Sequence, residues 1–557
     1  MDNYRPVLYI SLVFVLFLLW QAWQQDYVWP TQEPMAASGS SMTAEPTTDT
    51  PRLDVPDAPT AEAGQLPTGV PTDAVPVRET VRVVTDVLDL EIDTRGGSIV
   101  RADLPTYPVS LEEPDRPMRL LDEQVRQFVA QSGLIHDRVA DVDAERRAPS
   151  HHAVYRAEKT EYRLADGVDE LRVPLIWTDG SGVTVTKTFV LRRGHFLVDV
   201  EHHVDNASDA AWVGRQYRQL RHGPTPDRES YFIYTFTGAA YYDGRYEKLA
   251  FDDMVKKPID REVQGGWVSV IQHYFVTAWI PVADETSLFY TRVLGTAGRP
   301  EHIIGMRSGA QTAAPGERAS FTSSIWVGPK LQNELEDVAK GLELTADYGI
   351  FAFLAKPIFW LLSFIHGLVG NWGWSIIILT VMIKLAFYKL SATSYRSMAK
   401  MRAVQPKLQA LKERFGDDKQ RMQQALMELY KKEKINPLGG CLPILIQIPV
   451  FIALYWVLLE SVEMRQAPWI LWINDLSTKD PYFVLPVLMG ITMIVQHRLN
   501  PAPLDPVQQK LMMILPFVFT IFFAFFQAGL VLYWFVNNLL SIAQQWKITR
   551  AIAAETK

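Results

Sequence analysis

The sequence predicts a multi-domain protein, in which a polytopic α-helical membrane bundle of six spans is joined to a large antiparallel β-sandwich outside the membrane. Uncharged apolar runs lie near the N-terminus and beyond residue 356, and strand-like alternation fills the region between them. Charge divides in the same way. Residues 348–557 hold 21 Lys and Arg against 11 Asp and Glu, a net +10, so residues 1–347 carry −17 to give the total of −7. The chain is therefore not an average soluble enzyme, and no overall basicity calls for a nucleic-acid partner.

The six spans follow from uncharged runs, since an α-helix needs about 20 apolar residues to cross a bilayer. These runs are residues 6–25, 357–383, 435–459, 481–496 and 511–546. The second run is too long for one upright span, and Asn371 to Trp374 suggests either a break or a tilted helix with an aromatic belt at one interface. Gln527, Ala528 and Gly529 divide the last run into spans 511–526 and 530–546. A cleaved signal peptide is the alternative for the first run. However, the sequence from Trp20 to Trp23 lacks the small residues of a cleavage site, which favours an uncleaved anchor.

The orientation follows from the basic residues of the short loops. Segment 389–436 holds 12 Lys and Arg against 5 Asp and Glu, which predicts that it is cytoplasmic. The loop 460–480 holds four acids and two bases, which places it outside. Both termini are then inside, and region 26–345 is outside.

Between the first two spans the pattern is that of β structure. Leu88, Leu90 and Ile92 alternate with acids, and the apolar residues of 183–191 and 196–204 keep one parity across Gly194, as in a hairpin. Such runs continue to Trp326 and predict a sandwich. The predicted organisation is an anchor (1–25), a disordered linker (26–79), a β-sandwich (80–330), connecting and interfacial amphipathic helices (331–357), the second span (358–390), a basic helical hairpin (391–436), four further spans (437–548) and a short tail (549–557).

The basic segment 394–434 reads as two amphipathic helices. Its apolar residues recur at helical spacings, and Gly416 to Asp418 separates the two helices. The first stripe comprises Met398, Met401, Leu408, Leu411 and Phe415. The plain interpretation of the surface cations is a positive-inside anchor, and the alternative is a docking surface.

Signals of catalysis or of a bound cofactor are missing from the sequence. Neither a GxGxxG nor a P-loop pattern is present, so we expect no nucleotide site and no enzyme. The pairs His151–His152 and His202–His203 are adjacent on strands and point to opposite faces, so we expect no metal site. The single cysteine, Cys441, lies in an apolar span, excludes an intramolecular disulfide and is expected to pack. No cofactor is expected.

Polar residues within the predicted spans are the best candidates for a site, because lipid makes them costly. Thr380 and Lys384 share one helix face, as do Tyr533 and Asn537, and Gln447 lies in the third span. Lys384 could simply snorkel to the cytoplasmic interface, with the other groups bonding neighbouring helices. The alternative is a polar cavity in the bundle, with Lys384 as its charge.

Several short stretches resemble the YidC family of bacterial membrane protein insertases. They are NPLGGCLP at 436–443, SMAKM at 397–401, Gln405–Pro406, EMRQAP at 463–468 and GLVLY at 529–533. The resemblance is specific over 345–548. The anchor, linker and β domain resemble the form with a large periplasmic domain, found in Gram-negative bacteria.

The resemblance implies an insertase and chaperone of the inner (cytoplasmic) membrane, acting on nascent membrane proteins alone or with the Sec translocon and without nucleotide hydrolysis. It also implies a hydrophilic groove that contains one basic residue, here Lys384. By position, Thr380, Gln447 and Tyr533 would line or approach the groove. The apolar residues Phe451, Met493 and Phe522 would contact the substrate, and Trp372 would be an aromatic near the outer end of the second span. Ribosome or signal-recognition components would dock on 394–434, and the lipid bilayer would surround the bundle.

This chain departs from the family pattern at a few positions. Lys384 stands where Arg is usual, and a lysine can lose its proton when it is desolvated, so the groove must stay wet. Trp534 stands where Tyr is common, and the tail after Trp546 is short for a ribosome-binding extension. Two rival functions are a secondary transporter, which would need internal repeats that we do not find, and a scaffold whose outer β domain binds periplasmic partners.

Overall fold

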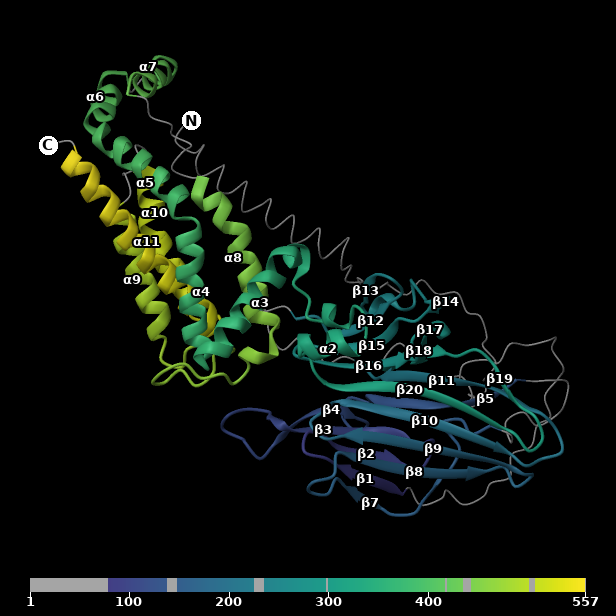
Figure 1. Cartoon of the computed structure of the whole chain (residues 1–557). Helices are drawn as coiled ribbons and strands as arrows, with labels where there is room; N and C mark the ends of the chain where they lie inside the picture. The colour runs from purple at the N-terminus through teal and green to yellow at the C-terminus, as the bar shows by residue number, and fades with distance from the viewer. Residues whose placement is uncertain are drawn as a thin grey trace. The chain divides into compact units, whose positions relative to one another are not determined.

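A computed structural model of the chain describes residues 79–137, 148–224, 235–296, 299–415, 418–433, 442–499 and 506–555. The predicted anchor (1–25), nearly all of the linker (26–79) and Cys441 lie outside these residues. The chain forms two compact units (Figure 1). Among the described residues, the β unit extends to Asp347 and includes Glu460–Glu463, and the helical unit contains Tyr348–Leu459 and the residues from Met464 onward.

The β unit holds two sheets. The first, of 11 strands among the described residues, has a main path that runs in the order β14 (Asp260–Gln264), β17 (Thr286–Thr296), β18 (Arg299–Arg307), β11 (Trp212–His222), β5 (Val129–His136), β3 (Ser98–Pro108), β2 (Asp89–Asp93), β1 (Thr80–Val84) and β7 (Glu161–Arg163). Off this path, β19 (Gln311–Ala313) pairs with β11 and β4 (Pro117–Asp122) pairs with β3. The ladders are antiparallel except for β1 with β7.

The second sheet has nine strands among the described residues. Their order is β13 (Tyr246–Leu249), β12 (Gly238–Tyr242), β15 (Trp267–Gln272), β16 (Phe275–Pro281), β20 (Arg318–Pro329), β10 (Leu197–Asn206), β9 (Val183–Arg192), β8 (Glu170–Thr178) and β6 (Arg156–Ala157). The predicted hairpin is confirmed as β9–β10. Val185 pairs with Val204 and Phe189 pairs with Val200, and Gly194 takes a positive φ of 73° in the turn.

The two sheets share an apolar core, which confirms the predicted β-sandwich. Their inward-facing side chains form one large buried cluster and a smaller second one, and both clusters draw residues from the two sheets. Polar bonds also join the sheets. The Trp279 ring N–H on β16 donates to the Gln219 carbonyl on β11 (3.1 Å), and Lys187 on β9 reaches the Ser132 carbonyl on β5 (3.0 Å). After β20 come the short helix α2 (Gln332–Val338) and the 3₁₀ turns η5 (Leu342–Thr345) and η6 (Gly349–Phe351); another turn, η4 (Phe251–Asp253), follows β13.

The helical unit contains the helices α3 (Ala352–Val369), α4 (Trp372–Ala386), α5 (Tyr388–Ala403), α6 (Gln405–Phe415), α7 (Lys419–Lys432), α8 (Leu442–Glu460), α9 (Val484–Leu499), α10 (Pro506–Phe523) and α11 (Ala528–Glu555), with the turn η8 (Val462–Met464) after α8. The long helix α11 packs against α4, α5 and α9, while α10 packs on α9 and α3 on α4. Side chains of α8, such as Ala453 and Val457, are buried in the same apolar cluster.

The predicted second span, residues 358–390, is distributed over three helices instead of one. Helix α3 ends at Gly370, whose positive φ of 69° is the left-handed conformation that commonly terminates helices. Asn371 then caps α4, because its side chain accepts a hydrogen bond from the Trp374 amide. A bend of 66° separates α4 from α5. The first break lies where the sequence from Asn371 to Trp374 suggested one. The bend between α4 and α5 was not expected.

By length and composition, one helical stretch of the described residues, Gly349–Val369, could cross a bilayer, and the bent pair α4–α5 could form a second crossing. Three shorter apolar helical stretches are Gln447–Glu460, Val484–Leu499 and Gln509–Phe523. The count of six spans therefore stays a prediction.

The basic segment is built from the end of α5 and from α6 and α7. Helix α6 ends at Phe415, and Asp418 caps α7 by accepting from the Arg421 amide (3.1 Å). Val404 and Leu408 are buried between these helices, packed against Met401 and the apolar side chains of α7. The cations face outward. Those with described side chains are exposed: Lys389, Arg396, Lys400, Arg402, Lys407, Arg414, Arg421, Lys431 and Lys432.

Candidate functional site

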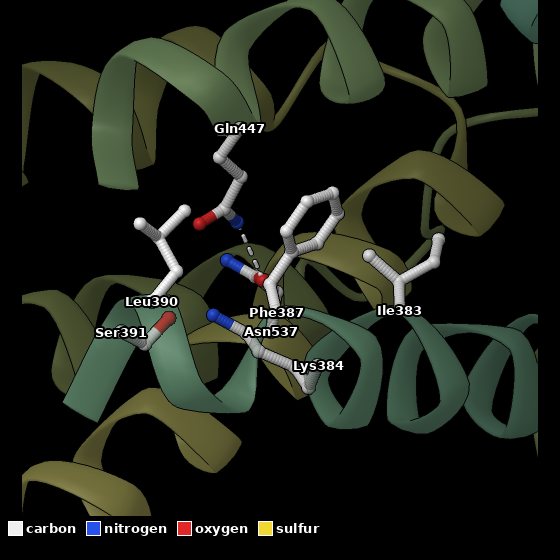
Figure 2. A pocket seen from close by; sticks show the side chains of 7 residues that line it. All are labelled: Ile383, Lys384, Phe387, Leu390, Ser391, Gln447 and Asn537. Atoms are coloured by element: carbon white, nitrogen blue, oxygen red, sulfur yellow. Dashed lines mark hydrogen bonds between the residues drawn. The ribbon is translucent and has the colours of Figure 1, made fainter. Parts of the chain in front are cut away.

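A small hollow in the helical unit brings a lysine and two amide side chains together (Figure 2). It contains about 320 Å³ of empty space, part of it open to the surroundings. Its lining side chains come from helices α4, α5, α8 and α11 and from residue 387, which lies between α4 and α5. The lining residues are Ile383, Lys384, Phe387, Leu390, Ser391, Gln447 and Asn537. The lining of the hollow is thus mixed, with four polar and three apolar side chains.

Lys384 is held at the hollow by one side-chain contact. Its ammonium donates to the Ser541 Oγ on α11 at 2.8 Å, and that hydroxyl donates to the Asn537 carbonyl one turn earlier (2.7 Å). Lys384 is partly buried, and among the described residues its side-chain hydrogen bond to Ser541 is the one contact of its ammonium. Two of the three N–H donors of the ammonium therefore have no acceptor among the described residues, and they can donate to water or to a polar ligand.

The two amides meet across the bundle. Gln447 on α8 donates from its Nε2 to the Oδ1 of Asn537 at 2.7 Å (Figure 2). Because helices in lipid cannot satisfy such groups with bulk water, this bond also joins α8 to α11. The hollow therefore combines one cation, two amides and a serine hydroxyl.

The structure brings Lys384 and Gln447 together, as the polar-cavity interpretation expects, but it places the other predicted polar residues elsewhere. Thr380 is buried, and its hydroxyl donates to the Ile376 carbonyl of its own helix (2.6 Å). Tyr533 is also buried. Its hydroxyl lies near Gln447, but the geometry does not meet the criteria for a hydrogen bond. Neither residue lines the hollow.

The predicted apolar contact residues and Trp372 surround the site at greater distance. Phe451 stacks on Tyr533 with ring centroids 6.1 Å apart, Met493 packs at the edge of the bundle core, and Phe522 is 44% exposed. Trp372 stacks on His366 at 3.9 Å, where α3 meets α4. Their contact with a substrate stays a prediction.

Sequence reasoning noted Asn537 as a neighbour of Tyr533 but did not select it, and it missed Ser391 and Ser541. The signal for Ser541 was present in the spacing. Ser541 follows Asn537 by one turn of α11, so the two lie on one helix face. Ser391 lies beyond the bend between α4 and α5, and its spacing from Lys384 does not report their proximity. Among the described residues, no group of three or more His, Cys, Asp or Glu could hold a metal ion.

The loop between α8 and α9 closes the opposite end of the bundle. Asn371 Nδ2 donates to the Pro468 carbonyl (3.1 Å), and the first amides of α11 bond the same loop, Ala528 to the Thr478 carbonyl (2.6 Å). The hollow lies about 20 Å along α4 from Asn371 at 1.5 Å per residue. The hollow and this hydrogen-bonded loop thus lie near opposite ends of α4.

Comparisons with known proteins identify the family. Residues 80–361 match a family model described as "YidC periplasmic domain", and residues 364–555 match one described as "60Kd inner membrane protein". The insertase YidC of Thioalkalivibrio sulfidiphilus is 71% identical over 99% of both chains. That of Methylococcus capsulatus is 52% identical over 100% of this chain and 99% of its own. The chain belongs to the YidC membrane protein insertase family.

This assignment confirms the resemblance seen in the short motifs, and the members of the YidC family are insertases, not enzymes. They are proteins of the inner membrane, as the second family model states. Among solved structures, the crystal structure of an active YidC insertase matches 84% of this chain and 92% of its own, with 16% identity and a TM-score of 0.38. The assignment rests on the sequence matches.

Proposed function

We propose that this protein inserts nascent membrane proteins into the bacterial inner membrane, and that the hollow around Lys384 receives polar parts of the incoming chain. The relatives carry the name "Membrane protein insertase YidC". The observation that carries the proposal is the Lys384 ammonium, which lies partly buried beside the amides of Gln447 and Asn537 and keeps two donors for a ligand.

The physical reason is the cost of a dry crossing. Each backbone polar group left unpaired in hydrocarbon costs several kcal/mol, so a wet hollow shortens the costly path. Short helices shorten it further. Helices α4 and α9 have 15 and 16 residues, or roughly 22–24 Å, against the roughly 30 Å of a bilayer core. Such helices would thin the bilayer locally.

Insertion by this route needs no nucleotide. Apolar segments of the substrate leave sideways into lipid, and their burial supplies about 25 cal/mol per Å². Phe451, Met493 and Phe522 would guide those segments. Lys384 would attract the acidic or polar residues of a translocated tail, and a wet hollow keeps it charged despite the substitution of Lys for Arg.

Partners and orientation complete the proposal. With both termini cytoplasmic and residues 26–345 periplasmic, the basic segment 394–434 faces the ribosome. Its cations point outward from an apolar seam formed by Val404 and Leu408, which supports docking of ribosome or signal-recognition components. Sec translocon components would share some substrates.

Site-specific photocrosslinking tests the groove. A photoreactive amino acid replaces Phe387 or Leu390, which line the hollow. The control position is Leu385 on α4, which is 66% exposed and does not line the hollow. Stalled ribosome complexes that carry a short membrane protein are then added to membranes containing each variant. We expect adducts from positions 387 and 390 several times more abundant than from 385. Equal yields at the three positions would contradict a substrate path through the hollow.

A further inference from the structure

The loop at residues 464–483 turns its acidic side chains inward. Asp475 Oδ1 accepts from the Gln466 and Ser477 amides (3.0 and 2.8 Å). Asp480 is 1% exposed and accepts from the Leu485 amide (2.7 Å) at the start of α9. These two acids therefore contribute little to the surface of the loop, whereas the base Lys479 is exposed.

The apex of this loop carries an unusual leucine. The Trp469 amide donates to the Ile473 carbonyl (2.9 Å) and closes a tight turn, in which Leu471 has a φ of 54° and is 78% exposed. A bulky residue is disfavoured in this left-handed conformation and normally persists only where its surroundings hold it. So exposed a side chain is not held by packing against the described residues.

Three more large apolar side chains are exposed in the same loop. Ile470 and Tyr482 are 38% and 69% exposed, and Phe483, also left-handed at φ 56°, is 39% exposed. The Trp472 ring lies 6.3 Å from the Tyr482 ring and donates to Asp480 (3.0 Å), which ties the two ends of the loop together. We name Ile470, Leu471, Tyr482 and Phe483 the apolar tip.

The apolar tip continues a surface that faces lipid. Helix α9 begins directly after Phe483 and exposes Val487, Ile491 and Val495. In an inner-membrane family these side chains contact acyl chains. Tryptophan and tyrosine favour the depth at which hydrocarbon meets the headgroups, which suits Trp472 and Tyr482 at the end of such a helix.

We propose that the apolar tip is inserted into the bilayer interface and that lipid, not water or protein, is its partner. Contact with acyl chains supplies the environment that favours the exposed left-handed Leu471. The loop then anchors the closed end of the bundle in the membrane at the start of α9, rather than standing above it. This inference depends on the membrane location of the family and not on the route of the substrate.

Fluorescence quenching tests the depth of the tip in the full-length protein. Cys441 is replaced by Ser, and single cysteines are introduced as Leu471→Cys or Asn474→Cys, the latter an exposed polar position in the same loop. Each variant is labelled with an environment-sensitive fluorophore and reconstituted in phosphatidylethanolamine–phosphatidylglycerol vesicles. We expect lipid-attached nitroxide to quench position 471 at least twofold more than 474, and aqueous iodide to show the reverse order.

A second variant separates insertion from labelling artefacts. Leu471→Asn keeps a residue that tolerates the left-handed conformation but removes the apolar side chain. With the probe at Tyr482→Cys, this change should reduce quenching by lipid nitroxide at least twofold. The proposal fails if iodide quenches positions 471 and 474 equally, if Leu471→Asn leaves the Tyr482→Cys signal unchanged, or if a photoreactive group at 471 crosslinks chiefly to protein.

Discussion

The β unit and the helical unit each hold an inward-facing lysine, and the two lysines differ in burial and in the number of their hydrogen-bond acceptors. Lys187 is fully buried and donates to three backbone carbonyls, those of Gly96, Gly97 and Ser132, at 2.8–3.0 Å. Lys384 is only partly buried and has one side-chain acceptor, Ser541.

The difference shows which buried cation can have a ligand. An ammonium has three donors, and all three of Lys187 are used within the fold, where they join the two sheets. Lys384 keeps donors free beside an open hollow. A charge that is saturated by its own fold supports structure, whereas a charge left partly unsatisfied next to space is suited to transient binding.

The largest expected effect comes from deleting parts of the two units. Removing residues 80–325 should leave most insertion activity, because the sandwich has its own core and the hollow is built from helices alone. Removing 330–360 should abolish insertion, since this segment includes the start of α3, which packs on α4. Insertion of a Sec-independent substrate into membranes of depleted cells measures both. If the two deletions are equally damaging, the proposed division of roles is wrong.

A further deletion, of residues 400–430, should stop insertion while the protein stays in the membrane, because it removes most of the outward-facing cations of the basic segment and leaves Lys431 and Lys432. Normal insertion by this variant would instead support the plain positive-inside interpretation.

Lys187→Met should destabilise the β unit strongly while sparing the site. Three carbonyl oxygens lose their donor, at about 1 kcal/mol or more each, so we expect a loss of roughly 3 kcal/mol in the free energy of unfolding. Urea titration of the full-length protein measures this loss, with unfolding of the β unit monitored by limited proteolysis at each urea concentration. Lys159→Met, on a residue whose side chain is exposed, is the matched control. Wild-type stability in Lys187→Met would show that the three bonds contribute nothing.

Lys384 substitutions should show the reverse pattern, with insertion impaired and stability kept. The attraction between an ammonium and an acidic substrate residue in a wet hollow is roughly 1 to 4 kcal/mol at contact. Lys384→Ala should therefore reduce Sec-independent insertion about tenfold, Lys384→Glu should reduce it more, and Lys384→Arg should retain it. Protease protection of a short N-terminal tail in inverted vesicles is the measurement. Equal protection for wild type, Ala and Glu would support snorkelling alone.

The last prediction concerns Glu463, which belongs to the β unit. Its Oε2 is buried without a hydrogen-bond partner among the described residues, and burial raises the pKa of the carboxyl to about 7 from the usual 4.5. The pKa of Glu463 is higher in the folded than in the unfolded protein. Its protonated carboxyl therefore contributes to folding stability fully below pH 4.5, and this stabilisation is lost as the pH rises through 7. The slope is at most about 1.4 kcal/mol per pH unit. Calorimetry between pH 5 and 8 should show the decline, and Glu463→Gln should flatten it.

Local sequence signals predicted much of the fold. Alternation at Val183, Val185 and Phe189 predicted β9, and it placed Lys187 on the same inward face without explaining a charge there. The stop at Gly416 to Asp418 predicted the boundary between α6 and α7, since caps act within one turn. Within the predicted second span, the sequence from Asn371 to Trp374 suggested the break that follows Gly370. The bend at Phe387 depends on backbone geometry, which no charge or spacing signal marks.

The sequence by itself determined the family, the β-sandwich and the choice of Lys384 and Gln447, because motifs, period-2 alternation and intramembrane polarity are local properties. Tertiary structure alone decided which of these side chains contact one another. Lys384 and Ser541 are 157 residues apart, and Gln447 and Asn537 are 90 apart, yet each pair forms a hydrogen bond. It also turned Thr380 onto its own helix and Asp480 into its own loop. A side chain takes whichever partner the packed helices bring within 3 Å or so, and no spacing along the chain reports that distance.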